Sequence, residues 1–286
     1  MDIADPRRLD ATLRRHGARA AKSLGQHFLV DRGVLAAIVE AAELTRNDDV
    51  LEVGPGPGIL TAALAERARS VTAIEIDERM VAMLRDTLGE RDNVRIIRAD
   101  ALEVDLFAQG ERRPTRIVAN LPYQITTPLL ERFIGDERRP ALVVVLVQEE
   151  VARRIVAKPG NERAPRERGY LSVFVESFAD ARIVRRVPPR AFRPPPRVSS
   201  AVVALRTRAR PAFAPLDQRA FLRFVSDVFR HRRKQLRAAL GHEAGIERDR
   251  AERALAAAGI EPRRRAEELS FAEWVALASA LGAARE

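Results

Sequence analysis

The hydrophobic residues between positions 49 and 147 alternate between two patterns. Stretches between short apolar runs follow the 3.6-residue period of a helix, and 78–88 places its Met and Leu side chains on one face. The apolar runs themselves are rich in Val and Ile and predict strands at Val50–Val53, Val71–Ile76, Val94–Arg98, Arg116–Ala119 and Ala141–Val147. Repeated strand–helix units predict a doubly wound α/β sheet, which binds ligands at the carboxyl ends of its strands.

The chain continues with one more helix and two further strands. Apolar residues from Leu171 to Phe178 predict the helix, and the strand-like runs are Arg182–Val187 and Ser200–Arg206. The link between these two runs is short and rich in proline. A parallel crossover needs a dozen or more residues and usually a helix, so the two runs are predicted to form an antiparallel pair. This pair distinguishes the sheet from an all-parallel dinucleotide-binding fold.

A change of composition predicts a domain boundary. Residues 206–215 are rich in Arg and Pro, and everything beyond them follows a helical pattern. Asp217 is placed to cap one helix, and Ser270 with Glu273 forms a capping box that opens the last one. We therefore expect a catalytic domain at 1–206, with a basic N-terminal arm, and a small all-α domain at 207–286.

The net charge of the chain indicates a polyanionic partner. The 286 residues carry 50 Lys and Arg against 40 Asp and Glu, a formal net charge of +10. Residues 207–286 hold 16 of the basic and 11 of the acidic residues, and 230–234 is their densest basic cluster (Arg-His-Arg-Arg-Lys). Such a surface gains affinity for a polyanion by releasing phosphate counterions, although a solvated helix face is the alternative.

Other aspects of composition narrow the class of protein. The chain has no cysteine, so disulfides, thiolate metal sites and cysteine nucleophiles are excluded, and we expect no metal. The N-terminus lacks the apolar core of a secretory signal, and the longest dense apolar run, 141–147, is too short to span a bilayer. We expect a cytoplasmic protein without membrane contact.

Residues at the ends of three predicted strands are candidates for binding a nucleoside cofactor. Gly54 and Gly56 lie in a G-x-G-x-G turn after the first strand, where glycine allows a sharp turn and a close approach of ligand to backbone. Glu75 ends the second strand, where a carboxylate can accept hydrogen bonds from both ribose hydroxyls. Asp100 follows the third strand and could accept an exocyclic adenine amine. The G-x-G-x-G spacing differs from the G-x-G-x-x-G that seats a pyrophosphate, so the pattern favours S-adenosylmethionine over NAD.

The fourth strand ends in Asn120-Leu121-Pro122-Tyr123, which indicates the acceptor of the methyl group. An adenine amine is a poor nucleophile because its lone pair is delocalised into the ring. The Asn120 side-chain oxygen and the Leu121 carbonyl could bind both N–H groups and favour a pyramidal nitrogen. Pro122 restrains this backbone before substrate arrives. Tyr123 offers a face for a flipped-out base, and stacking needs its ring rather than its hydroxyl.

At these residues the sequence resembles the ribosomal RNA adenine N6-dimethyltransferases, most closely the bacterial enzymes of the small subunit. The likeness runs from Lys22 to the last helix, and it includes a G-Q-x-F-L segment at residues 25–29 and a Pro-rich stretch at 187–198. The resemblance implies a Rossmann-like class I methyltransferase sheet. It also implies that Gln26, His27 and Leu29 join Gly54, Gly56, Glu75, Asp100 and Asn120 around S-adenosylmethionine.

The resemblance further implies how the base and the RNA are bound. Phe192 would sandwich the target adenine against Tyr123, so that Asn120, Leu121, Tyr123 and Phe192 form the catalytic set. The expected activity is dimethylation of N6 on adjacent adenosines near the 3′ end of 16S rRNA, during assembly of the small ribosomal subunit. We expect a monomer whose partner is 16S rRNA or the immature subunit.

Three alternatives remain at this point. The chain could be the antibiotic-resistance relative that methylates large-subunit RNA, which the RNA labelled by the enzyme would decide. It could be a non-catalytic assembly factor that kept the fold, although the intact Glu75, Asn120 and Tyr123 speak against this. It could also be a dehydrogenase, which would prefer a nicotinamide cofactor.

Overall fold

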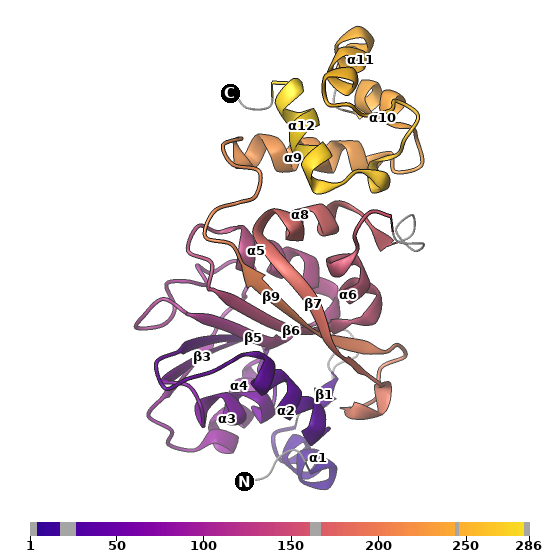
Figure 1. Ribbon diagram of the computed structural model, residues 1–286. Coiled ribbons are helices and arrows are strands. Elements are labelled where there is room, and N and C mark those ends of the chain that lie inside the picture. Colours follow the sequence, from indigo (N-terminus) through magenta and orange to yellow (C-terminus); the bar gives the residue numbers. More distant parts are fainter. Residues whose placement is uncertain (1–4, 18–26, 161–166, 244–245, 283–286) are drawn as a thin grey trace. The chain divides into compact units, whose positions relative to one another are not determined.

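A seven-stranded sheet is the largest sheet in the computed structural model, which describes residues 5–17, 27–160, 167–243 and 246–282 (Figure 1). The strand order is β4-β3-β2-β5-β6-β9-β7. The first five of these strands pair in parallel, whereas β9 is antiparallel to β6 and separates it from β7. The predicted α/β fold is confirmed. The bounds are β2 (Asp49–Val53), β3 (Ser70–Glu75), β4 (Val94–Arg98), β5 (Arg116–Asn120), β6 (Leu142–Gln148), β7 (Ala179–Val187) and β9 (Ser200–Thr207).

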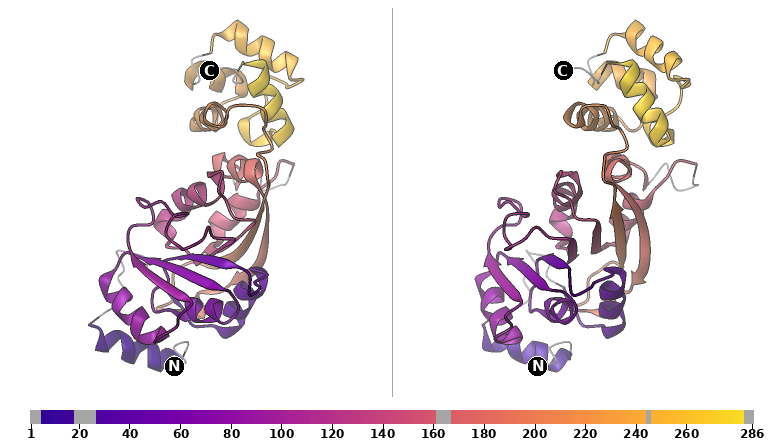
Figure 2. Two further views of the ribbon diagram at one scale, coloured as in Figure 1. Left: turned by 90° about the vertical axis from the view of Figure 1, so that its left-hand side faces the viewer. Right: turned by 60° about the vertical axis from the view of Figure 1, so that its left-hand side comes forward.

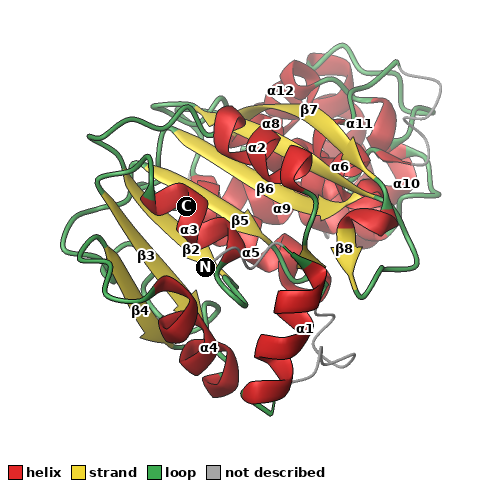
Figure 3. Ribbon diagram, turned by 90° about the horizontal axis from the view of Figure 1, so that it is seen from below, coloured by secondary structure: helices red, strands yellow, loops and turns green. Residues whose placement is uncertain are grey.

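Helices cover both faces of the sheet (Figure 3). On one face lie α2 (Arg32–Ala41), α3 (Ile59–Ala65) and α4 (Glu78–Leu88), and α5 (Thr126–Gly135) lies on the other, with α6 (Glu149–Val156) following β6. Asp31 and Asp77 cap α2 and α4 by accepting backbone N–H groups of their first turns. Gly58 opens α3 at a φ of 89°, where a Cβ atom would lie 2.6 Å from Leu84 of α4. The close packing of α3 on α4 therefore requires glycine.

A short second sheet joins the N-terminal segment to the Pro-rich stretch. β1 (Phe28–Leu29) pairs antiparallel with β8 (Phe192–Arg193), which follows the short 3₁₀ helix η3 (Pro189–Ala191). Helix α1 (Pro6–Arg15) packs Leu9 and Leu13 into a cluster with Phe28, Ile59 and the methionines of α4. Asp10 of α1 forms an ion pair with Arg193. The N-terminal segment and the Pro-rich stretch, far apart in sequence, are thus joined by strand pairing and by an ion pair.

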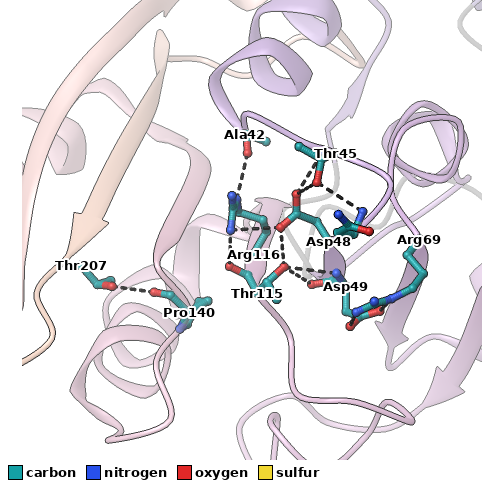
Figure 4. A network of polar contacts seen from close by, with 10 residues as sticks. Ala42, Thr45, Asp48, Asp49, Arg69, Thr115, Arg116, Pro140 and Thr207 are labelled. Carbon is teal, nitrogen blue, oxygen red and sulfur yellow. Dashed lines mark hydrogen bonds and ion pairs between the residues drawn. The ribbon is translucent and has the colours of Figure 1, made fainter.

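The amino ends of the strands are held by a polar network (Figure 4). The Asp48 carboxylate accepts hydrogen bonds from Thr45 and Thr115 and lies 3.1 Å from the Arg116 guanidinium. Asp49 forms an ion pair with Arg69, and the hydrogen bond from this guanidinium lowers the Asp49 pKa. These contacts join the start of β2 to the residues at the starts of β3 and β5.

The chain divides into two compact units: residues 1–152 with 181–207, and residues 153–180 with 208–286. The second unit holds α8 (Tyr170–Phe178), α9 (Gln218–Arg230), α10 (Leu236–Glu243), α11 (Arg248–Ala257), η4 (Ala266–Glu268) and α12 (Phe271–Ala280). The helices α9 to α12 are the orange and yellow ones in Figure 2. The sequence placed residues 153–180 with the sheet, but they pack with these helices. The functional roles assigned to 1–206 and 207–286 stay predictions.

Aromatic rings and one buried arginine explain why α8 belongs to the helical unit. Phe178 of α8 packs edge-on against Phe213, with ring centroids 5.6 Å apart, and Phe213 stacks on Phe221 of α9 at 4.8 Å. The fully buried Arg168 donates hydrogen bonds to Glu176 and to the Leu269 carbonyl, which joins the segment before α8 to that before α12. Within the described residues, no helix has the length and apolar character to cross a membrane.

Candidate functional site

A cavity of about 240 Å³ opens at the carboxyl ends of the parallel strands. It lies where the sheet order changes direction, since β3 and β4 follow β2 on one side and β5 and β6 continue on the other. This switch point is where open α/β sheets bind ligands. The lining comes from the segments that follow each strand, together with β1: residues 27–29, 52–57, 59–60, 74–76, 99–102 and 120–125.

The glycine turn after β2 forms the floor of this cavity. Gly54 and Gly56 have positive φ angles of 69° and 53°. The Gly54 N–H donates to the Ile74 carbonyl at 2.9 Å, which ties the turn to β3. A Cβ atom on Gly56 would lie 3.2 Å from the Phe28 ring. Both glycines line the cavity in a backbone conformation that favours glycine, and their contact with a ligand stays a prediction.

Glu75 lies at the end of β3 and is buried against the glycine turn. One carboxylate oxygen accepts the Gly56 N–H at 3.2 Å, and the other accepts the N–H groups of Ile76 and Asp77. A carboxylate has about four lone-pair positions, so it can still accept ribose hydroxyls. Burial raises the pKa of Glu75, and the three backbone hydrogen bonds act in the opposite direction.

Asp100 and Ile76 line the next part of the cavity. Asp100 lies two residues beyond the end of β4, and its carboxylate accepts the Leu102 N–H at 2.8 Å, which fixes its orientation. Ile76 is 54% exposed, unusual for a large apolar side chain. A polar acceptor beside an exposed apolar surface suits the amine edge and the face of a purine.

Asn120 ends β5 and connects two parts of the site. Its side-chain N–H group donates to the His27 carbonyl at 3.3 Å, so its oxygen is the atom left to accept a hydrogen bond from a ligand. The next residue, Leu121, is anchored by its N–H group, which donates to the Leu146 carbonyl of β6 at 3.1 Å. The two predicted acceptors of an adenine amine therefore lie on a backbone held by the neighbouring strand.

Tyr123 begins the short 3₁₀ helix η2 (Tyr123–Ile125) and is held by two contacts. Its hydroxyl lies 2.7 Å from the hydroxyl of Ser200 in β9. Its ring stacks on that of His27, with centroids 5.9 Å apart and an interplanar angle of 29°. His27 is in turn held by a hydrogen bond between Nδ1 and the Pro194 carbonyl at 2.8 Å. His27 therefore links the Tyr123 ring to the backbone that follows β8.

The remaining predicted site residues divide into three cases. Leu29 lines the cavity as expected. Gln26 falls outside the described residues. Phe192 is 3% exposed and packs in the hydrophobic core, and it is not among the residues that line the cavity in the described ranges. Phe192 shares a hydrophobic core cluster with Leu29, its partner in the β1–β8 pairing, and its role in binding the base stays a prediction.

Sequence reasoning missed Glu52, which lines the same cavity from β2. It is 1% exposed, and among the described residues its Oε2 atom has no hydrogen-bond partner. Burial raises the pKa of Glu52 to about 8, against the smaller opposing effect of the Thr61 hydroxyl. Its place two residues before Gly54, between the apolar Leu51 and Val53, was the available signal.

The sheet order and the site define the Rossmann-like methyltransferase class. The solved dimethyladenosine transferase from Plasmodium falciparum has this fold, with a TM-score of 0.73 and 23% identity, covering 90% of this chain and 98% of that one. The solved 23S rRNA methyltransferase ErmE has a TM-score of 0.66 and 31% identity, covering 89% and 99%.

The chain belongs to the ribosomal RNA adenine dimethylase family, whose pattern matches residues 17–282. Two similar relatives carry the name ribosomal RNA small subunit methyltransferase A. That of Moorella thermoacetica is 43% identical, covering 98% of both chains. That of Shouchella clausii is 42% identical, covering 98% of this chain and 96% of the relative.

The cofactor of this family is S-adenosylmethionine, and the cavity fits it. Glu75 would accept the ribose hydroxyls, and Asp100 with Ile76 would contact the adenine. Gly54, Gly56 and Asn120 line the same cavity and would complete the site. When bound there, S-adenosylmethionine supplies an electrophilic methyl group.

We predict that Glu75→Ala weakens binding of S-adenosylmethionine tenfold or more, because hydrogen bonds to a charged group are worth about 1.5–3 kcal/mol each. Since the Glu75 pKa is raised, affinity in the wild type should also weaken as the pH falls and this carboxylate takes up a proton. Titration calorimetry at several pH values measures both effects. The exposed Glu66→Ala is the control, and unchanged affinity in Glu75→Ala would refute the assignment.

We predict that Glu52→Gln stabilises the protein increasingly as the pH rises. A carboxyl whose pKa is raised from 4.5 to about 8 binds a proton in the folded state that the unfolded chain has lost, so stability declines as the pH rises across this window. Between pH 6 and pH 8 the variant should gain about 2 kcal/mol in free energy of unfolding relative to the wild type. Urea unfolding measures it, and a difference independent of pH contradicts the prediction.

Proposed function

We propose that this chain dimethylates the N6 amino groups of adjacent adenosines near the 3′ end of 16S rRNA, as a step in assembly of the small ribosomal subunit. The observation that carries the proposal is the Asn120–Tyr123 turn, which lies beside the cofactor cavity with the Asn120 side-chain oxygen left to accept a hydrogen bond. An acceptor fixed at this point selects an amine as the nucleophile.

The residues of this turn prepare the amine for methyl transfer. In the first transfer, Asn120 and the Leu121 carbonyl accept the two N–H groups of the amine and draw the nitrogen lone pair out of conjugation with the ring. In the second transfer, the methylated amine has one N–H left for one of these acceptors. The Tyr123 ring stacks on the base. No strong general base is required, because the nitrogen becomes acidic as it gains the methyl group and its proton passes to water. The chain's contribution is positioning and hydrogen bonding.

The choice of the small subunit rests on similarity. The relatives named ribosomal RNA small subunit methyltransferase A share 42% and 43% of their residues with this chain, against 31% for the 23S rRNA methyltransferase ErmE. We propose that the natural substrate is an immature small subunit in the bacterial cytoplasm, and that the enzyme acts as a monomer. The helical unit would hold the RNA through its basic surface.

We predict that Asn120→Ala lowers the rate of methyl transfer about a hundredfold or more, because the amine loses a fixed acceptor that acts in the transition state. The assay uses small subunits from a strain without this modification, labelled S-adenosylmethionine and primer extension, since dimethyladenine stops the polymerase. The wild type should stop extension at the 3′ adenosine of the adjacent pair, which the polymerase meets first.

The matched control is Asn93→Ala. Asn93 also donates its side-chain N–H to a carbonyl, that of Ala65 at 2.9 Å, but it precedes β4 at the opposite edge of the sheet. Near-normal turnover in Asn120→Ala would show that the acceptors lie elsewhere. A wild type that labels only large-subunit RNA would refute the proposed substrate.

We predict that removing three positive charges from the helical unit weakens RNA binding and leaves affinity for S-adenosylmethionine unchanged. Arg233, Lys234 and Arg237 are exposed members of the basic cluster and its continuation into α10. Replacing all three by Gln should flatten the log–log salt dependence of RNA binding by about 0.7 for each phosphate that the variant no longer neutralises, if the RNA there is single-stranded. Filter binding across a salt series measures the slope.

The control removes the same charge elsewhere. Arg46, Arg67 and Arg113 are exposed and precede β2, β3 and β5, at the edge of the sheet opposite the cavity. Their triple Gln variant should bind RNA like the wild type. An unaltered slope in the helical-unit variant would mean that its cluster is a solvated face and not part of the RNA site.

A further inference from the structure

The hydroxyl of Tyr123 has a specific partner. Its oxygen lies 2.7 Å from Oγ of Ser200, a residue with 0% exposure. Ser200 is the first residue of β9 and lies opposite Gln148, the last residue of β6. Stacking on a base needs only the ring, so the sequence alone indicates no role for this hydroxyl.

The hydrogen bond between Tyr123 and Ser200 connects the end of β5 to the start of β9. Tyr123 follows β5, and β6 lies between β5 and β9 in the sheet order. The phenol ring therefore crosses the carboxyl end of β6, attached to the backbone after β5 at one end and hydrogen-bonded to β9 at the other. A ring held at both ends cannot turn about its Cα–Cβ bond without breaking the hydrogen bond. The ring therefore keeps a constant direction at the cavity that Asn120 and Leu121 also line.

We propose that Ser200 is a positioning residue for the methyl acceptor, and that its hydroxyl holds the Tyr123 ring in the orientation that receives the adenine face. This inference rests on the proposed function. Ordering an aromatic side chain during binding costs conformational entropy, and a ring already ordered by Ser200 avoids that cost. It also keeps the bound amine aligned with the acceptors through the reaction.

Several features of the site support this role. The antiparallel pairing of β9 with β6 sets the position of Ser200 independently of the loop that carries Tyr123. Burial raises the pKa of Tyr123, with the Ser200 hydrogen bond acting in the opposite direction, so the phenol stays neutral and keeps its proton for hydrogen bonding. The other contact of the Tyr123 ring is stacking on His27, which involves the ring face and not the hydroxyl. The hydrogen bond to Ser200 is therefore the contact that restrains the hydroxyl end.

A double-mutant cycle tests the proposal. Ser200→Ala and Tyr123→Phe each remove the same hydrogen bond, so each should lower kcat/KM for small subunits about three- to tenfold. The double variant should be no worse than either single variant, because either substitution alone already removes the whole interaction. Affinity for S-adenosylmethionine should stay within twofold of the wild type in all four proteins.

Ser177→Ala is the matched control. Ser177 is equally buried, and its hydroxyl donates to the Val173 carbonyl within α8, in the helical unit. It should retain wild-type kcat/KM. The proposal is overturned if Ser200→Ala leaves kcat/KM unchanged, if its effect is the same in the wild-type and Tyr123→Phe backgrounds, or if cofactor affinity falls in parallel. Failure of the proposed function appears differently, as a wild type that methylates no adenine.

A second readout needs no turnover. The chain has two tyrosines, Tyr123 and Tyr170, so protein labelled with ¹³C at the tyrosine Cζ gives two signals. Tyr170→Phe identifies the Tyr123 signal. In Ser200→Ala this signal should shift, because the hydroxyl loses its partner, whereas the Tyr170 signal should not. A Tyr123 signal unchanged by Ser200→Ala overturns the proposal.

Discussion

The parallel pairing of β5 with β2 is the constraint on which the site depends. After β4 the chain returns across the sheet, and Val50 and Leu51 of β2 align with Arg116 and Ile117 of β5. This return brings the ends of strands on both sides of β2 to one edge. The glycine turn, Glu75 and Asn120 all lie at that edge because their strands run in the same direction. A shift of the β5 register would move Asn120 away from the cavity, whatever the local sequence of its turn.

Burial at this edge separates the roles of two carboxyl groups. Glu75 is buried but accepts three backbone hydrogen bonds, which favour its ionised form. Glu52 has no such bonds to Oε2 within the described residues, and its pKa rises to about 8. The Glu75 carboxylate can thus accept hydrogen bonds from hydroxyl groups, whereas Glu52 is mainly protonated at neutral pH. Their proximity reinforces the difference, since the Glu75 charge further disfavours ionisation of Glu52.

The sequence predicted the parts of the site that follow from local pattern. The helix at 78–88 has the predicted bounds, and strand ends placed Glu75, Asp100 and Asn120 at the cavity. Long-range pairing was not predictable in this way. Ser200 lies 77 residues from Tyr123 and reaches it only because β9 inserts between β6 and β7. The position of Phe192 depends likewise on its pairing with β1. Periodicity reveals that a strand exists and which of its faces is buried, but not its neighbour.

The cavity residues and the basic surface require different precision in the placement of their side chains. Every described residue that lines the cavity belongs to the unit of residues 1–152 and 181–207, whereas half of the net charge lies in residues 207–286. Charge acts over a Debye length of about 8 Å or more in solution, but hydrogen bonds to a reacting amine require placement within tenths of an ångström. A sheet edge, held by strand register, supplies that precision. Under the proposed role in RNA binding, helices joined through aromatic packing need only present a basic surface, which demands less exact placement than a hydrogen bond to a reacting amine.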